Sequence, residues 1–300
     1  MKILILGSTG VIGSELLLEL SSLSDVHLTS LSSADLDLYS QLEKLDEVVA
    51  CLQPQIIINA AGFTDIDAIE SNKNRGFLLN CLLPHRLAEI CSLMCIQLIH
   101  FSSDNVFNGS KLSAYKETDS LSPINYYGWT KAHTDKLLLD NFGEYTTIFR
   151  ISGIYSHMGR NFFVSFLKRI EKGNVVKVVD DISVSPTTAN MVAKFIAQII
   201  YSGKFYQMRG LYNLATKGST SWFGFARKIV ESLDVPNDLI VAVSSDSYSH
   251  KVKRPKMSIL DCQKLENETF IDLPTWEDSF EEFMTIDSVK TLIPTFPLHA

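Results

Sequence analysis

The sequence predicts an α/β fold in which helices cover both faces of a parallel sheet. Short apolar runs recur along the first half of the chain without alternating with polar residues, which is typical of strands buried on both faces. Stretches with apolar residues at helical spacing separate these runs. A glycine-rich turn at 7–13 joins the first apolar run to the first helical stretch. Strands that alternate with helices in this way imply parallel pairing.

The elements of the first half follow in order. Each expected strand is a short apolar or β-branched run, and these lie at 3–6, 26–31, 56–58, 96–101 and 146–151. Each expected helix shows apolar residues three or four positions apart, and these lie around 16–20 and at 42–52, 78–94 and 126–139. Together they predict a Rossmann-like, doubly wound sheet over 1–151.

The second half is less regular. It predicts strands at 175–179 and 210–215, helices at 187–201, 222–233 and 276–284, and a basic loop at 251–256. Since no linker separates the halves, a smaller C-terminal α/β substrate domain should be interleaved with the first. We expect 174–204 to return to the dinucleotide-binding domain, and 152–173 with 205–300 to form the substrate domain.

Composition narrows the function classes. The 300 residues include 27 Lys and Arg against 34 Asp and Glu, a formal charge of −7. This balance argues against a general nucleic-acid binder and against an anionic membrane surface as partner. No apolar run approaches the roughly 20 residues of a membrane span, and the run at 3–6 is shorter than a signal-peptide core. Five cysteines without CxxC spacing fit a reduced, cytoplasmic protein.

No metal site is expected, because the seven histidines are scattered without ligand spacing. The acids Asp65, Asp67 and Glu70 fit a loop that leads into a helix, where acids are favoured near the N-terminus.

The glycine-rich turn is the first candidate site. It reads Gly7-Ser8-Thr9-Gly10-Val11-Ile12-Gly13. Glycines permit a tight turn and a close approach of backbone to a pyrophosphate, which the free N–H groups of the following helix then bind. The strand–turn–helix context favours dinucleotide binding over a plain structural turn.

The choice of nicotinamide cofactor depends on the end of the second strand. Residues 29–33 contain neither an acid for ribose hydroxyls nor an arginine for a 2′-phosphate. Serine hydroxyls could bind that phosphate, so NADPH is slightly favoured over NADH. Asp37 could contact adenine, or it could be a helix cap or loop acid.

The second candidate site is Tyr127-Gly128-Trp129-Thr130-Lys131. Tyr127 and Lys131 lie one helical turn apart on one face. An ammonium beside a phenol favours the phenolate, so we expect the pKa of Tyr127 to be lowered and the tyrosine to act as a general acid toward a carbonyl. Ser103 ends the fourth strand, at the carboxyl edge where such sheets bind ligands, and is the expected hydroxyl donor. The alternative for Ser103 is a serine that caps a turn.

These motifs resemble those of extended short-chain dehydrogenases/reductases, and within them the dTDP-4-dehydrorhamnose reductase family. The similarity runs nearly end to end. Beyond the two sites above, it includes the segments 58–70, 102–107, 117–119, 123–131, 150–155, 159–162, 186–187, 210–214, 254–255 and 273–276.

The resemblance implies NAD(P)H-dependent reduction of the C4 ketone of a dTDP-linked 6-deoxy-4-keto-L-sugar. The product, dTDP-L-rhamnose, would feed bacterial surface polysaccharide. The implied catalytic residues are Ser103, Tyr127 and Lys131. The implied cofactor contacts are Gly7, Thr9, Gly10, Val11, Ile12, Gly13, Asp37, Leu38, Ala60, Ala61, Gly62, Thr64, Ser102, Tyr127 and Lys131. The implied substrate contacts are Ser103, Asp104, Asn105, Val106, Tyr127, Gly153 and Arg254.

The chain departs from the family pattern around the sugar. The family usually has threonine at Ser103, tyrosine at Asn105, an aromatic at Gly153 and glutamine at Ile182. These changes should alter the sugar-binding site more than the residues that carry out hydride transfer. The alternatives are therefore a reductase, epimerase or dehydratase of another nucleotide sugar, or a non-catalytic NADP-binding regulatory subunit. Arg254 could instead belong to a solvated loop. We expect a homodimer, because dimers are the commonest oligomers of soluble proteins.

Overall fold

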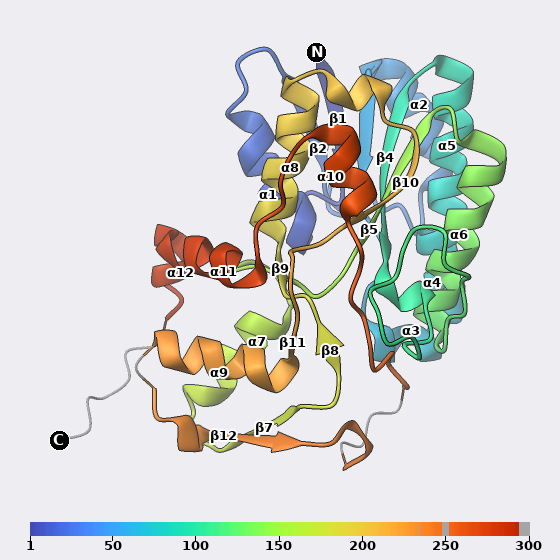
Figure 1. Ribbon diagram of the computed structural model, residues 1–300. Helices are drawn as coiled ribbons and strands as arrows, with labels where there is room; N and C mark the ends of the chain where they lie inside the picture. Colours follow the sequence, from blue (N-terminus) through green and yellow to red (C-terminus); the bar gives the residue numbers. More distant parts are fainter. Residues whose placement is uncertain (234, 248–251, 294–300) are drawn as a thin grey trace.

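A computed structural model describes residues 1–233, 235–247 and 252–293 (Figure 1). Its centre is a six-stranded sheet in the order β10-β5-β4-β3-β1-β2, and every neighbouring pair is parallel. The strands are β1 (Lys2–Leu6), β2 (His27–Leu31), β3 (Ile56–Asn59), β4 (Gln97–Ser103), β5 (Thr146–Ile151) and β10 (Gly210–Leu214). The expected parallel, doubly wound sheet is confirmed. The strand order reverses between β1 and β3, and open α/β sheets bind ligands at such a point.

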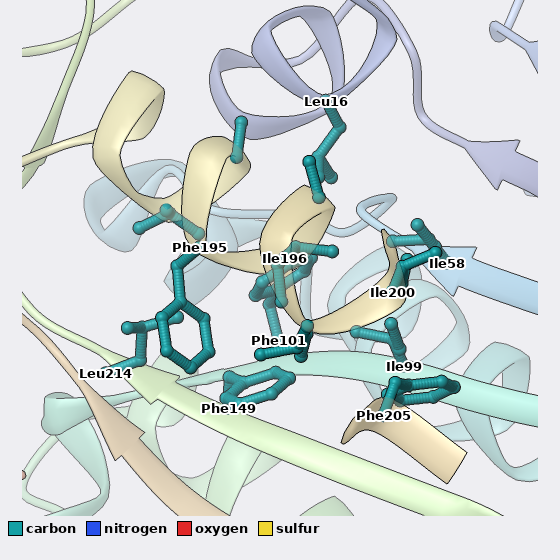
Figure 2. Close-up of a cluster of buried hydrophobic side chains, with 14 of the residues drawn as sticks. Leu16, Ile58, Ile99, Phe101, Phe149, Phe195, Ile196, Ile200, Phe205 and Leu214 are labelled. Carbon is teal, nitrogen blue, oxygen red and sulfur yellow. The ribbon is translucent and has the colours of Figure 1, made fainter. Parts of the chain in front are cut away.

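Helices cover both faces of this sheet because its strand side chains alternate between two cores. Ile3 and Ile5 of β1 pack with α1 (Val11–Ser21) and α8 (Ala189–Tyr201), whereas Leu4 and Leu6 pack on the opposite face. That face is covered by α2 (Leu45–Leu52), α5 (Leu83–Met94) and α6 (Tyr126–Phe142). Figure 2 shows Phe195 and Ile196 of α8 between Leu16 of α1 and the sheet residues Phe101 and Phe149.

One helix is longer than the sequence pattern indicated. α4 (Lys73–Phe77), the π-helical segment η2 (Leu78–Leu82) and α5 form one helix of 22 residues, preceded by α3 (Ile66–Ser71). By length and composition this helix could cross a membrane, although it is not an uninterrupted apolar run of the kind sought in the sequence. The polar residues Asn80, His85 and Arg86 interrupt the apolar sequence of this helix, so the sequence pattern did not show its full length. In the structure, 44% of its most apolar window is buried, and α5 packs in the core beneath the sheet.

A second unit lies beyond the carboxyl edge of the sheet, below it in Figure 1. Its core joins α7 (Phe162–Ile170), β7 (Val176–Val179), α9 (Trp222–Ser232), β12 (Ile240–Val243) and α11 (Trp276–Thr285). The shorter elements are β6 (Ile154–Tyr155), β8 (Ser183–Val184), β9 (Thr187–Thr188), β11 (Thr220–Ser221), α10 (Gln263–Thr269), α12 (Asp287–Lys290), η1 (Leu42–Lys44), η3 (Asp104–Val106), η4 (Lys204–Gln207), η5 (Asn237–Leu239) and η6 (Ser245–Ser247).

The domain boundaries drawn from the sequence differ from this arrangement in two places. β7, within 174–204, pairs with β12 in a separate two-stranded sheet, although α8 does return to the first unit. β10, within 205–300, pairs with β5 and completes the central sheet. Strand pairing between distant segments leaves no local signal, which is why the pattern misplaced both strands. Of the expected basic loop, Lys251 lies outside the described residues.

Candidate active site

The glycine-rich turn has the geometry of a pyrophosphate cradle. Gly7 has a φ of +78°, and a Cβ there would lie 2.7 Å from the backbone of Ala61. A Cβ on Gly13 would overlap the carbonyl oxygen of Gly7. The turn closes through a 3.0 Å hydrogen bond from the Gly10 N–H to that same oxygen. Because α1 begins without a side-chain cap, its first N–H groups remain open to an anion.

Helix α6, which carries Tyr127 and Lys131, is seated directly on the end of β4. The side chain of Asn125 caps α6 by accepting the Gly128 N–H at 2.8 Å. A Cβ on Gly128 would overlap the carbonyl oxygen of Asn105, so only glycine permits this approach. The contact brings Tyr127 close enough to Ser103 for the Ser103 hydroxyl to act against the rise that burial causes in the pKa of Tyr127. Both side chains are buried, Tyr127 at 8% and Ser103 at 5% exposure.

Ser103 is held by its neighbours in the chain. Its Oγ donates to Asp104 Oδ1 at 2.9 Å and accepts the Asn105 N–H at 3.2 Å. Ser103 thus caps a turn as well as facing Tyr127. Asp104 also accepts from the Asn105 amide at 3.0 Å and from the Ser152 hydroxyl at 2.8 Å. The Asp104 carboxylate is therefore engaged on both oxygens, and burial raises its pKa.

Lys131 lies one turn beyond Tyr127, and its ammonium donates to the Phe101 carbonyl at 2.8 Å. The same nitrogen is 3.8 Å from where a Cβ on Gly62 would be, which places it beside the loop after β3. Burial lowers the pKa of Lys131 to about 8. Burial also raises the pKa of Tyr127. The expected lowering of the Tyr127 pKa is wrong for this geometry, because burial dominates and the carboxylates of Asp104 and Asp135 raise the pKa further.

Several expected contacts are held by neighbours in the chain. The Asp37 carboxylate accepts from the Ser40 hydroxyl at 2.7 Å and the Tyr39 N–H at 3.1 Å, and the Ser40 hydroxyl lowers its pKa. The side chain of Leu38 packs in the core under α2 and α5. Val106, an expected substrate contact, is fully buried in a small apolar cluster and presents no surface to a ligand.

The other residues that depart from the family pattern are constrained by their neighbours. Asn105 is fixed by its bonds to Ser103 and Asp104, and its Oδ1 accepts from Asn125 at 3.3 Å. Gly153 has a φ of +59°, and a Cβ there would lie 2.6 Å from the Ser185 carbonyl oxygen. An aromatic side chain at this position would require the backbone around Ser185 to move.

A pocket of about 520 Å³ lies next to the loop after β3, and its lining does not include Ser103, Tyr127 or Lys131. It starts at Thr64 and at Ile154, the neighbour of Gly153, and extends between α7, β7 and α9. Its lining is Thr64, Asp65, Ile66, Asp67, Ile154, Arg160, Asn161, Phe162, Ser165, Arg169, Lys177, Val178, Val179, Ile182, Trp222 and Arg254. Of the residues predicted from the sequence, Thr64, Arg254 and the departing Ile182 face it.

The pocket is positively charged in an acidic protein. Four cations and two carboxylates line it, so two positive charges are in excess. Arg160 pairs with Asp65 at 2.6 Å, and Arg254 with Asp67 at 3.1 Å. Within residues 1–233, 235–247 and 252–293, no acid lies within ion-pair distance of Arg169 or Lys177.

The sequence analysis missed these two cations. Phe162, Ser165 and Arg169 share one face of α7, and their i, i+3, i+7 spacing in the sequence could have indicated this. No such spacing pointed to Lys177.

A family model described as "RmlD substrate binding domain" matches residues 1–288. The chain belongs to this family. A dTDP-4-dehydrorhamnose reductase from Burkholderia thailandensis is 32% identical, with 92% of this chain and 95% of that protein covered. The enzyme of the same name from Shigella flexneri is 30% identical over the same shares. The solved dTDP-4-dehydrorhamnose reductase of Bacillus anthracis, in complex with NADP, is 27% identical with a TM-score of 0.86, covering 95% of this chain and 98% of that one.

Proposed function

We propose that the protein reduces the C4 ketone of a nucleotide-linked 4-keto-6-deoxy sugar with NADPH or NADH. The substrate we favour is dTDP-4-dehydro-L-rhamnose, which gives dTDP-L-rhamnose for surface polysaccharide. The observation that carries this proposal is the buried pair of hydroxyls, Tyr127 and Ser103, at the carboxyl end of β4. Lys131 lies one helical turn beyond Tyr127. The glycine-rich turn follows β1, next to the point where the strand order reverses. The names of the family members support the same activity.

The glycine-rich turn fits a dinucleotide, because Cβ atoms on Gly7 and Gly13 would fill the space that brings its backbone close to a pyrophosphate. When bound, the reduced nicotinamide supplies the hydride. The buried phenol of Tyr127 holds the proton that the ketone oxygen receives. Its raised pKa keeps it protonated until charge develops on that oxygen. Ser103 would turn its hydroxyl proton from Asp104 Oδ1, which it bonds at 2.9 Å in this structure, to the ketone oxygen, while the Asn105 N–H keeps Oγ in place. The Lys131 ammonium then stabilises the phenolate.

The pocket accounts for the nucleotide half of the substrate. Its two excess positive charges match the two negative charges of a diphosphate diester. Phe162 and Trp222, with ring centroids 4.6 Å apart, offer an aromatic wall to a base. Arg254 is well placed for the diphosphate, because the neighbouring Lys253 carbonyl accepts from Asn125, the cap of the catalytic helix, at 3.0 Å. The sugar would then lie toward Thr64 and Ile154, at the end of the pocket formed by the loop after β3.

The hydrogen bonds that both Asp104 carboxylate oxygens accept favour a reductase over a dehydratase. A dehydratase needs a carboxyl group that can exchange a proton with the sugar. Here both Asp104 oxygens accept hydrogen bonds from Ser103, Asn105 and Ser152. We also propose a cytoplasmic homodimer; free Cys51, Cys81, Cys91, Cys95 and Cys262 support a reducing compartment.

The test is oxidation of NADPH, and separately NADH, by the purified protein with dTDP-4-dehydro-L-rhamnose. We expect Tyr127→Phe to lower kcat by roughly 10²–10⁴-fold while NADPH binding survives. The matched control is Tyr126→Phe, whose hydroxyl bonds the Lys73 carbonyl outside the site and should be dispensable. Turnover by Tyr127→Phe at the parent rate would contradict the assignment. Cofactor binding without turnover on any keto-sugar nucleotide would favour a regulatory subunit.

A further inference from the structure

We propose that Asp135 is a positioning residue of the active site. Its carboxylate, fixed by Arg150, keeps the buried Lys131 ammonium charged and so supports proton transfer by Tyr127. This inference rests on the proposed reductase function.

The first observation is an unbroken line of polar groups inside α6. Tyr127, Lys131 and Asp135 follow one another at intervals of four residues, which stacks them along one face of the helix. All three are buried, with exposures of 8%, 4% and 0%. A charged lysine at such a depth needs an opposite charge within the protein.

The second observation is the way Asp135 is held. Arg150 of β5 is 2% exposed, and its Nε donates to Asp135 Oδ2 at 2.8 Å. The guanidinium also lies 5.2 Å from the ring centroid of Phe107, and its Nη1 donates to the Glu117 carbonyl at 3.4 Å. Arg150 therefore fixes the orientation of the carboxylate.

Asp135 is itself deeply buried, and burial raises the pKa of its carboxyl group, whereas the Arg150 guanidinium and the Ser102 hydroxyl favour its charged form. The carboxylate lies one helical turn from Lys131, so its charge acts on the ammonium through the protein interior.

The other groups that face Lys131 do not supply this charge. His100 of β4 is buried, and burial lowers its pKa, so its ring is neutral at physiological pH. Cys81 of η2 is a buried thiol whose pKa is raised by burial, so it too is neutral. The charge of Asp104 acts on the Tyr127 phenol, as that of Asp135 also does, and raises the pKa of Tyr127, but it does not act on Lys131. Of the groups in the described chain, Asp135 is the carboxylate that acts on Lys131 and raises its pKa.

The consequence is a defined pH range for activity. With Asp135 in place, burial still lowers the pKa of Lys131 to about 8. Without the carboxylate the pKa should fall further, and the ammonium should be lost at a lower pH. Since Tyr127 needs that ammonium, kcat should fall at high pH as the ammonium is lost. This fall, the alkaline limb of the pH–rate profile, should move to lower pH when the pKa of Lys131 falls.

The experiment measures kcat for ketone reduction between pH 5.5 and 9.5 in the parent and in Asp135→Asn. We expect the alkaline limb of Asp135→Asn to move to lower pH by about one unit or more, a loss of roughly 10-fold at pH 8 with much smaller loss at pH 6. Asp135→Glu should restore most of the limb. The matched control is Thr134→Val, which removes a buried 2.7 Å hydrogen bond to the Asn80 carbonyl from the same helix without changing a charge. It should leave the limb in place.

Asp135→Asn leaves a buried arginine without its partner and could unfold the protein. The double variant Asp135→Asn/Arg150→Met removes both charges and should show the same direction of shift. A limb that stays at the parent pH in every folded Asp135 variant would overturn the proposal.

A second readout does not depend on turnover. The free energy of unfolding, measured in urea, should increase with pH once the folded protein loses the Lys131 proton, and this increase should begin at a lower pH in Asp135→Asn than in the parent. If the increase begins at the same pH in both proteins, the proposed role of Asp135 is wrong. A parent protein without turnover on any keto-sugar nucleotide instead refutes the proposed function, so the two failures are distinguishable.

Discussion

Replacing Lys131 with methionine should change how the stability of the protein depends on pH. The ordinary lysine pKa of 10.5 applies to the unfolded chain, whereas burial lowers it to about 8 in the folded protein. Between these values the unfolded chain binds more protons than the folded one. The free energy of unfolding of the parent should therefore rise with pH across that window. Methionine is of similar length and does not titrate, so the variant should lack this rise.

The magnitude follows from the size of the shift. A difference of about 2.5 pH units, at 1.36 kcal/mol each, is worth about 3 kcal/mol over the whole window. Between pH 7 and pH 9.5 the parent should gain about 2 kcal/mol relative to Lys131→Met. At pH 7 the variant escapes the penalty of a buried charge but loses the bond to the Phe101 carbonyl, which is worth about 1 kcal/mol.

The assay is urea unfolding of both proteins at pH 7, 8, 9 and 9.5. Because every other titrating group is shared, the difference in unfolding free energy between the two proteins isolates Lys131. A difference that stays constant to within about 0.5 kcal/mol from pH 7 to pH 9.5 would refute the reasoning. In that case the pKa of Lys131 in the folded protein equals its value in the unfolded chain, so burial does not penalise the ammonium.

Three further predictions concern the site. Ser103→Ala should lower kcat by roughly 10²-fold, since it removes a hydroxyl from the ketone oxygen, while Ser103→Thr retains most activity; equal rates for the two would exclude the hydroxyl. Arg169→Ala should raise KM for the nucleotide sugar roughly 10-fold with little effect on KM for NADPH, whereas the adjacent exposed Lys168→Ala, outside the pocket, should change neither. Gly128→Ala should destabilise the fold by about 1–3 kcal/mol because its Cβ meets the Asn105 carbonyl oxygen, and an unchanged thermal midpoint would contradict that contact.

The first half of the fold could be predicted because its signals are local. The apolar run 56–58, for example, shows a strand buried on both faces without reference to any partner, and it is β3. The turn at Gly7 and the four-residue interval from Tyr127 to Lys131 are likewise fixed by neighbours in the chain. Two of the three catalytic candidates therefore stood out as soon as the alternation of strands and helices was established.

The sequence by itself determined the parallel α/β architecture, the glycine-rich turn and the Tyr127–Lys131 helix, because each depends on the spacing of a few consecutive residues. The tertiary structure alone decided that β7 pairs with β12 and that Arg169 and Lys177 face one pocket. It also decided the ionisation of the site. The pKa of Tyr127 rises rather than falls because burial is a property of the whole packed chain, and no interval between two residues records how much water has been removed around them.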